Sequence, residues 1–362
     1  MLLKRRGPRA RRAGGIDAKL AHHRPGGGFC NPWPEEDVAH AGAFLRWRWQ
    51  RLIQGTAPER PPRAALPILP PEIERPRGSE STLALTWVGH ATFLIQIGRL
   101  NVLTDPVWSE RVSPLRWVGP RRIVPPGVPL DLLPPIDAIL LSHDHYDHLD
   151  APTVRTLVDR FGERLLWITP LGYASWLARR GARNVEELDW HTSTDVTHGL
   201  TRLTVTALPA RHWTRRSPFR RSRRLWASFS LDAGPAGRVY FGGDSAWFPG
   251  YARIGEHYGP FDAAILPVGA YAPRWFMRRA HLSPEEAVRA WRELGGRGAF
   301  IGMHWGTFML SDEPVLEPPS RLRSAWASEE HDSNLLVMLR HGETFRCNAS
   351  SDDSSAAAEP VG

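Results

Sequence analysis

His143-Asp144-His145-Tyr146-Asp147-His148 is the stretch that decides which fold this 362-residue chain is expected to adopt. It follows the apolar run 136–142, which is too short for a helix and predicts a buried strand. Beyond the hexad, a helix is predicted from Asp150 onward. Its apolar side repeats at helical spacing: Val154, Leu157, Val158 and Phe161. The hexad therefore lies in a strand-to-helix loop, where side chains can converge on a small space.

The hexad combines three imidazoles with carboxylates. Residues two apart on an extended stretch point the same way, so His143, His145 and Asp147 share a side while His148 is offset. Imidazole nitrogen and carboxylate oxygen are ligands that suit zinc. The alternative is a polar surface loop that happens to hold three histidines, and the spacing favours a metal-binding loop.

Other polar residues occupy the same kind of position, at the end of a predicted strand where a loop begins. They are His212 after 203–208, Asp244 after 238–241, His304 after 299–303, and His281 before a helix that starts with the capping box 283–286. Each one alone is more typical of a hydrogen-bonded structural residue. Together with the hexad they predict a metal centre, and glycines beside Asp244 and His304 would permit the close backbone approach it needs.

Counted as ligands, these residues would fill two metal ions. His143, His145 and His212 would bind the first, Asp147, His148 and His304 the second, and Asp244 would bridge them. A place remains for a water between the ions, whose pKa the ions would lower. We therefore expect two Zn²⁺ ions per chain.

The rest of the chain divides by composition. We expect a disordered basic tail over 1–28, a helix and a proline-rich arm packed on the domain over 29–80, one catalytic domain over 81–345, and a disordered tail over 346–362. The helix is predicted from about 35 to 54, where aromatic residues alternate with arginines. This helix either packs on the domain or faces a membrane or a partner, and the sequence leaves both open.

Composition also limits the class of protein. Two cysteines far apart give no disulfide framework, and neither a signal peptide nor an apolar run long enough to span a membrane is seen. The expected location is cytoplasmic, and peripheral contact with an anionic membrane is left open. The net charge of +8 favours anionic partners, which are phosphates, an anionic membrane face or nucleic acid. Whether the chain forms a homodimer is left open.

Several sequence blocks resemble one family closely. They include Asn31-Pro-Trp-Pro34, Trp87-Val-Gly-His-Ala-Thr92, Leu103-Thr-Asp-Pro106, Ser142-His-Asp-His-Tyr-Asp-His-Leu-Asp150, Gly269-Ala-Tyr-Ala-Pro-Arg-Trp-Phe-Met277 and His304-Trp-Gly-Thr-Phe308. With them the chain resembles the metallo-β-lactamase superfamily and, within it, the N-acylphosphatidylethanolamine-hydrolysing phospholipase D family of bacterial type. The resemblance covers most of residues 29–345.

This resemblance implies an α/β fold, the αβ/βα sandwich of two mixed β-sheets flanked by helices, with a dizinc site at its edge. The seven ligands counted above match the family's ligand positions. Tyr146 and His281 match positions that contact the substrate phosphate. The implied reaction is hydrolysis of N-acylphosphatidylethanolamine to N-acylethanolamine and phosphatidic acid.

The segment 211–224 is more basic than the family pattern suggests. It carries seven arginines, among them Arg215, and Arg274 lies in a second basic stretch. We predict that Arg215 and Arg274 bind substrate as part of a surface for anionic lipid or another phosphate-rich substrate. The alternative is a solvated, flexible loop.

The resulting hypothesis is a zinc-dependent phosphodiesterase of the phospholipase D type. A metal-bridging hydroxide would attack phosphorus, Asp147 would orient it, and His281 would hold the phosphate or protonate the leaving alkoxide. The alternative hypothesis is a sugar-phosphate lactonase or other small phosphoester hydrolase of the same fold. A nuclease is disfavoured because no nucleic-acid-clamping segment is seen, so no nucleic-acid partner is expected.

Overall fold

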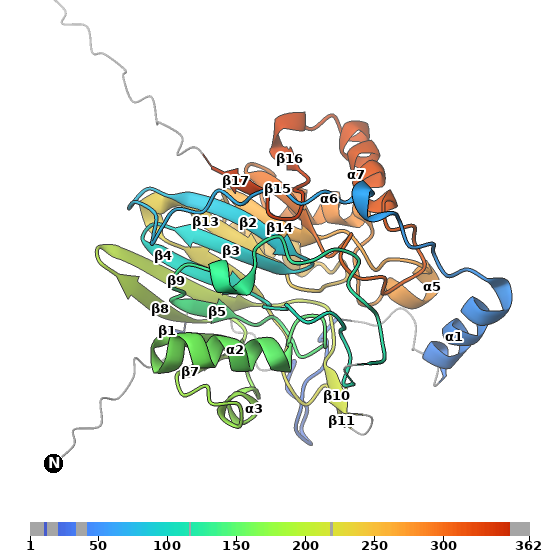
Figure 1. Cartoon of the computed structure of the whole chain (residues 1–362), viewed down its shortest axis with the longest axis horizontal. Helices are drawn as coiled ribbons and strands as arrows, with labels where there is room; N and C mark the ends of the chain where they lie inside the picture. The colour runs from blue at the N-terminus through green and yellow to red at the C-terminus, as the bar shows by residue number, and fades with distance from the viewer. Residues whose placement is uncertain (1–10, 13–20, 34–41, 116, 218–219, 348–362) are drawn as a thin grey trace, which may run out of the picture.

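The computed structural model describes residues 11–12, 21–33, 42–115, 117–217 and 220–347. Within them the chain forms two mixed β-sheets that face each other (Figure 1). The seven-stranded sheet has the order β17 (Thr344–Arg346), β2 (Leu83–Gly89), β3 (Thr92–Ile97), β4 (Leu100–Thr104), β5 (Ala138–Leu140), β6 (Leu166–Pro170), β7 (Val185–Leu188). The eight-stranded sheet has the order β1 (Arg11–Arg12), β8 (Thr192–His198), β9 (Thr201–Leu208), β12 (Ser228–Asp232), β13 (Arg238–Phe241), β14 (Ala263–Pro267), β15 (Ala299–Met303), β16 (Leu336–Val337).

The two sheets follow the same plan. In each, an antiparallel part comes first, from β17 to β4 in one sheet and from β1 to β13 in the other. A parallel part follows, from β4 to β7 and from β13 to β16. Parallel neighbours need long crossover connections, and these carry most of the helices.

The main hydrophobic core lies between the sheets. Side chains alternate along β3, so Phe93 and Ile95 join this core, where they cluster with Phe229 and Ile265 of the other sheet. Leu94 points to the opposite face and packs in a separate cluster under the helices. Both faces of the central strands are therefore buried.

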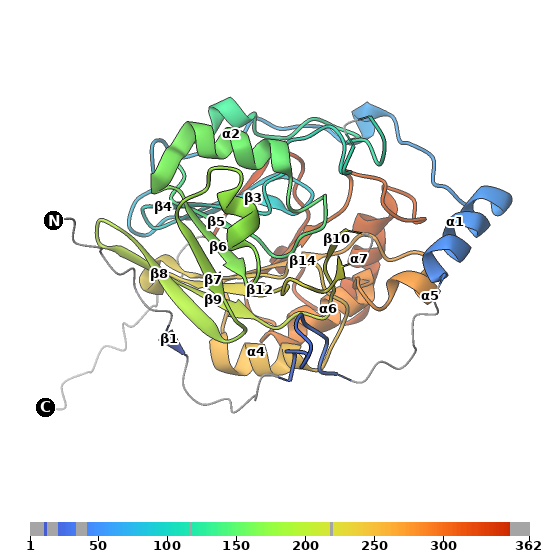
Figure 2. The same cartoon turned by 90° about the horizontal axis from the view of Figure 1, so that it is seen from below.

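Helices cover the two outer faces. α2 (Ala151–Phe161) and α3 (Ala174–Ala178) cover the seven-stranded sheet, while α4 (Gly250–Tyr258), α6 (Pro284–Glu293) and α7 (Glu317–Ser328) cover the eight-stranded sheet. Figure 2 places α2 on one side of the sandwich and α4 and α6 on the opposite side. The predicted αβ/βα sandwich is confirmed. Two further helices, α1 (Ala43–Gln54) and α5 (Arg274–Met277), lie together at one end (Figure 1).

The apolar strands were predicted well and the polar elements were not. The strands predicted at 238–241 and 299–303 match β13 and β15 to the residue. The capping box at Ser283 is present, since its hydroxyl accepts from the Glu286 amide and the Glu286 carboxylate accepts from the Ser283 amide. The elements β7, β8, α4 and α7 were not predicted. β8 has only one apolar residue in seven, so it lacks the alternation that predicts a strand.

The N-terminal segment is ordered further out than predicted. Phe29 donates its amide to Ser222, and His22 and His23 both bond to the Asp189 carboxylate, at 2.7 and 3.0 Å. The expectation of a disordered tail is therefore wrong for residues 21–28. Its remainder at 1–10 and 13–20, the predicted helical residues 35–41 and the tail 348–362 lie outside the described residues.

None of the helices in the described part of the chain has the length and apolarity needed to cross a lipid bilayer.

Candidate metal centre

The centre forms where strands of both sheets end. The hexad follows β5 of the seven-stranded sheet, while His212, Asp244 and His304 follow β9, β13 and β15 of the eight-stranded sheet. All seven predicted ligands come together there, in two groups. The first group is His143, His145, His212 and Asp244, and the second is His90, Asp147, His148 and His304.

A glycine permits this meeting of the sheets. Gly243 has a φ of 55°, and a Cβ at this position would lie 2.6 Å from the Cβ of Ser142, just before the hexad. A side chain here would therefore push Asp244 away from His143. The close approach predicted from the glycines beside Asp244 is confirmed.

The first group points bare imidazole nitrogens at one space. Nε2 of His143 lies 2.9 Å from Nδ1 of His145, which lies 3.2 Å from Nε2 of His212. The outer nitrogens are held from behind, since Nδ1 of His143 contacts the Ser142 hydroxyl at 2.9 Å and Nδ1 of His212 donates to the Ala280 carbonyl at 2.9 Å. Such outer contacts fix the tautomer and leave the inner nitrogen available as a ligand.

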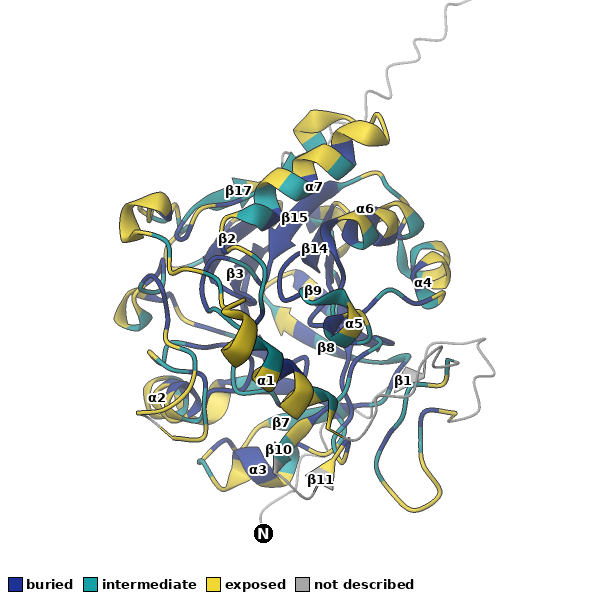
Figure 3. Cartoon of the chain, turned by 90° about the vertical axis from the view of Figure 1, so that its right-hand side faces the viewer, coloured by how far each residue is buried: buried dark blue, intermediate teal, exposed yellow. Residues whose placement is uncertain are grey.

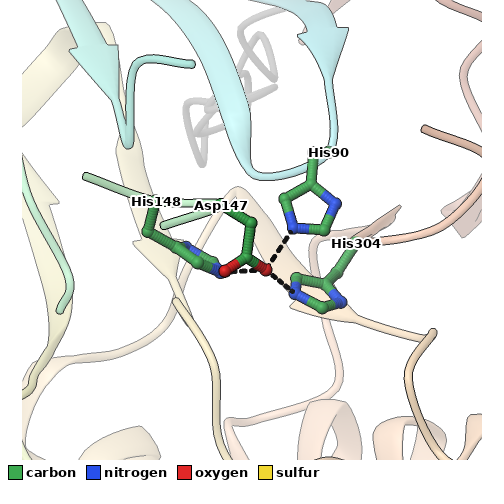
Figure 4. Close-up of side chains that lie close together, drawn as sticks. All are labelled: His90, Asp147, His148 and His304. Carbon is green, nitrogen blue, oxygen red and sulfur yellow. Dashed lines mark hydrogen bonds and ion pairs between the residues drawn. The ribbon is translucent and has the colours of Figure 1, made fainter. Parts of the chain in front are cut away.

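The second group centres on Asp147 (Figure 4). Its Oδ2 lies 2.9 Å from Nε2 of His90, 3.4 Å from Nε2 of His304 and 3.5 Å from Nε2 of His148. Nδ1 of His148 donates to the buried Asp105 carboxylate at 2.7 Å. That carboxylate fixes the His148 ring with its Nε2 toward Asp147, as carboxylates behind metal-bound histidines do.

Asp244 joins the two groups. Its Oδ2 lies 3.8 Å from Nε2 of both His143 and His212 and 3.3 Å from Nε2 of His148. Its Oδ1 lies 3.2 Å from Nε2 of His304. One carboxylate thus faces both ligand groups, as the predicted bridging role requires.

The electrostatics favour a cation in this space. Burial and the neighbouring imidazoles lower the pKa of His143 well below its ordinary value, and burial does the same to the pKa of His212. Although burial alone would raise it, the surrounding imidazoles hold the pKa of Asp244 well below its usual range. Although burial alone would lower it, the carboxylates of Asp244 and Asp147 raise the pKa of His148 well above its ordinary value. Ionised carboxylates and imidazole lone pairs therefore face one volume, where a metal ion can replace protons.

Buried polar atoms without partners support the same assignment. Among the described residues, Nε2 of His145 and His148, both ring nitrogens of His304 and Oδ1 of Asp244 are buried without a hydrogen-bond partner. Each such atom costs about 1–3 kcal/mol when it stays unsatisfied. Metal ions held between the two groups would satisfy several of them at once, so this donor set fits a pair of ions of the zinc type.

The predicted substrate contacts lie beside the centre. His281 is mostly buried and its Nδ1 has no hydrogen-bond partner and lies 3.8 Å from Oδ2 of Asp244. Burial lowers the pKa of His281 to about 4. The Tyr146 hydroxyl donates to the Arg216 carbonyl at 3.3 Å, and the Arg216 guanidinium lies 4.2 Å from the centre of its ring.

Arg274 is engaged elsewhere. Its guanidinium forms two hydrogen bonds of 2.8 Å to Glu286 and donates to the His281 carbonyl at 3.0 Å. Its direct contact with substrate remains a prediction, and the observed contacts make it a residue that positions His281. Arg215 has an exposed side chain, and its role in substrate binding also remains a prediction.

Asp144 of the hexad anchors the basic hairpin. The hairpin is β10 (Arg215–Ser217) with β11 (Arg220–Arg221). Asp144 accepts from the Arg215 amide at 2.8 Å and from the Arg224 guanidinium at 2.7 Å. Asp144, which is not among the seven predicted ligands, therefore ties the hexad to the Arg-rich segment.

Two residues of the centre were missed in the sequence. His90 and Asp105 each lie just beyond a strand end, after β2 and β4, inside blocks that carried the family resemblance. His90 has a φ of 58° and is fully buried, a strained conformation that is found most often at functional sites. The strand-end rule used for the other ligands would have found both.

Known proteins share this architecture and sequence. The model of a family described as "Beta-lactamase superfamily domain" matches residues 100–305. An uncharacterized protein of Mycobacterium tuberculosis is 43% identical over 287 residues, which cover 78% of this chain and 73% of that protein. The N-acyl-phosphatidylethanolamine-hydrolyzing phospholipase D 1 of Caenorhabditis elegans is 39% identical over 278 residues, covering 75% of this chain and 77% of that protein. Among solved structures, a possible metal-dependent hydrolase from Veillonella parvula superposes with a TM-score of 0.58 at 17% identity, over 73% of this chain and 99% of that one.

Proposed function

Because the chain belongs to the metallo-β-lactamase superfamily and, within it, to the N-acylphosphatidylethanolamine-hydrolysing phospholipase D family, we propose that this metal-dependent hydrolase is a zinc phosphodiesterase. Its substrate in this proposal is N-acylphosphatidylethanolamine, and its products are N-acylethanolamine and phosphatidic acid. The name of the relative from Caenorhabditis elegans supports this choice of substrate.

The observation that carries the proposal is the pair of ligand groups joined by Asp244. Two zinc ions held there would activate a water for attack on phosphorus and neutralise charge on the phosphate oxygens. His143, His145 and His212 would hold one ion, and Asp147, His148 and His304 would hold the other. This donor arrangement suits phosphoester hydrolysis, where both attacking and leaving groups are oxygens.

The residues beside the ligands supply orientation and a proton. Asp147 lies at the centre of the second group and accepts a hydrogen bond from His90, so its carboxylate is in place to orient the attacking water. His281, with an unpartnered Nδ1, is placed to hold a phosphate oxygen and to relay to the leaving ethanolamine oxygen the proton that the attacking water releases. Water adds to phosphorus, the bond between phosphorus and that oxygen breaks, and the leaving alkoxide takes up one proton.

Burial of the centre supports the proposal because it strengthens electrostatic interactions with the substrate phosphate. His143, His148, His212 and Asp244 are all buried. Interactions between charges and dipoles are stronger in such a site than in water, which strengthens the hold on a charged phosphate. Tyr146, half-buried beside Arg216, is the hexad side chain that would contact the phosphate group in this proposal.

A single experiment tests the proposal. The purified protein is analysed for metal content and then offered N-acylphosphatidylethanolamine or plain phosphatidylethanolamine, with products identified by mass spectrometry. We expect about two zinc ions per chain and release of N-acylethanolamine with phosphatidic acid. Hydrolysis confined to small phosphoesters or sugar-phosphate lactones, with neither lipid cleaved, would contradict the proposal and favour the rival enzyme class.

A further inference from the structure

The helix α1 turns an apolar face outward. Its side chains Leu45, Trp49, Leu52 and Ile53 are between 63% and 78% exposed. They are spaced i, i+4, i+7 and i+8, so they form one stripe along the helix. Large exposed apolar groups gathered on one element mark an interaction surface.

The opposite side of α1 holds the helix in place. Trp47 is buried and stacks on Phe276 of α5, with ring centres 5.3 Å apart. Its indole nitrogen donates to Asp312 at 2.6 Å. The helix α1 is therefore held on the protein by a different face from the one that carries the outward stripe (Figure 3).

The two segments that anchor α1 also carry residues of the centre. Phe276 precedes His281 by five residues, and Asp312 follows His304 by eight. Arg46 of α1 lies over the ring of Trp275, 4.9 Å from its centre, which adds a half-exposed indole beside the stripe. The packing of α1 is thus linked to the metal centre through two short segments of chain.

The charge of α1 selects one kind of partner. The helix contains three arginines and neither aspartate nor glutamate. Figure 3 also places the Arg-rich hairpin β10–β11 on the same face as α1. Apolar and indole side chains flanked by arginines are the pattern that lies in the boundary layer of an anionic bilayer. A helix of 12 residues is only about 18 Å long, too small to supply by itself the roughly 800 Å² per partner of a stable protein interface.

We propose that the outward stripe of α1 inserts shallowly into an anionic phospholipid bilayer and presents the metal centre to lipid headgroups. This inference rests on the proposed phospholipid substrate and adds the surface on which the enzyme works. The protein would act as a peripheral enzyme whose catalytic rate on vesicles depends on α1.

The test is co-sedimentation of the full chain with vesicles made from equal parts of phosphatidylcholine and phosphatidylglycerol. The double variant Leu45→Ser/Leu52→Ser should bind roughly tenfold less, since two exposed apolar side chains no longer enter the bilayer. The control Leu200→Ser replaces a 90% exposed leucine in the β8–β9 turn, at the end of the sandwich opposite α1, and should bind like the wild type. Vesicles of phosphatidylcholine alone should bind the wild type more weakly.

The outcomes separate this inference from the proposed function. Equal vesicle binding by the double variant and the wild type would overturn the inference, as would a change in oligomeric state by light scattering with vesicle binding unchanged. Wild-type binding without cleavage of N-acylphosphatidylethanolamine would support docking and contradict the substrate. Cleavage in detergent micelles should be equal for the variant and the wild type, whereas cleavage in vesicles should fall only in the variant.

Discussion

The metal centre and the outward stripe of α1 are built by opposite means. At the centre, polar atoms are buried from water and held by contacts that leave their inner nitrogens bare. On α1, apolar side chains are left in water although the same helix buries Trp47 a few residues away. Each arrangement costs stability in the isolated chain, and each of our proposals supplies what would offset that cost: metal ions in one case and a bilayer in the other.

The largest expected effect comes from replacing Asp244, the carboxylate that faces both ligand groups. Asp244→Ala removes the carboxylate that faces both groups, so both ions should be lost and kcat/KM should fall roughly 10³-fold or more. Metal analysis and kinetics on the same sample check this. Asp232→Ala, which removes a half-exposed carboxylate paired with Arg238, should keep full metal content. Normal turnover by Asp244→Ala would rule out the bridging role.

Removal of the metal should destabilise the fold, because buried polar atoms would lose their partners. A strong chelator should abolish turnover and lower Tm, because atoms such as Nε2 of His148 and His304 would again be buried without partners, at about 1–3 kcal/mol each. Added zinc should restore both. Thermal melts with and without chelator measure the shift, and an unchanged Tm with lost activity would mean that the ions bind too weakly to stabilise the fold.

His90 tests how far the centre depends on residues behind the ligands. Its Nε2 donates to Asp147 and its amide donates to the Thr307 hydroxyl at 2.7 Å. His90→Ala should lower kcat about 10- to 100-fold, the usual cost of removing such a support. His90→Gln, which can still donate to Asp147, should recover part of kcat. If both variants lose activity equally, His90 serves as a ligand or a core residue rather than as a donor to Asp147.

The sequence pointed to the candidate ligands because chemistry limits which residues can bind a metal ion. Histidine and aspartate at the ends of predicted strands, such as Asp244 after β13, mark the site once the strands are known, and those strands are strongly apolar. His90 and Asp105 also follow strand ends, but they were not counted because the other seven residues already filled two ions. Their role follows from the meeting of strands far apart in sequence.

The direction that α1 faces could not be predicted for a related reason. The pattern of about 35–54 predicted a helix with arginines between the aromatic residues, which fits packing on the domain or contact with a membrane or a partner equally well. The choice depends on Phe276 and Asp312, more than two hundred residues away, which capture Trp47. A contact between residues so far apart in the chain cannot be predicted from one sequence. Only the structure therefore shows which face of α1 is exposed.

The smallest effect is expected for Leu52→Ser on α1, which is compared with the buried Trp47 of the same helix. Leu52 is 78% exposed, so Leu52→Ser should change the free energy of unfolding by no more than about 0.5 kcal/mol. Trp47→Ala, five residues earlier and 6% exposed, should cost about 3 kcal/mol, since it removes a buried ring together with its bond to Asp312. Urea unfolding of the two variants measures the difference. A large loss from Leu52→Ser would mean that the stripe packs against the protein in solution, and its free exposure to a bilayer would then have to be abandoned.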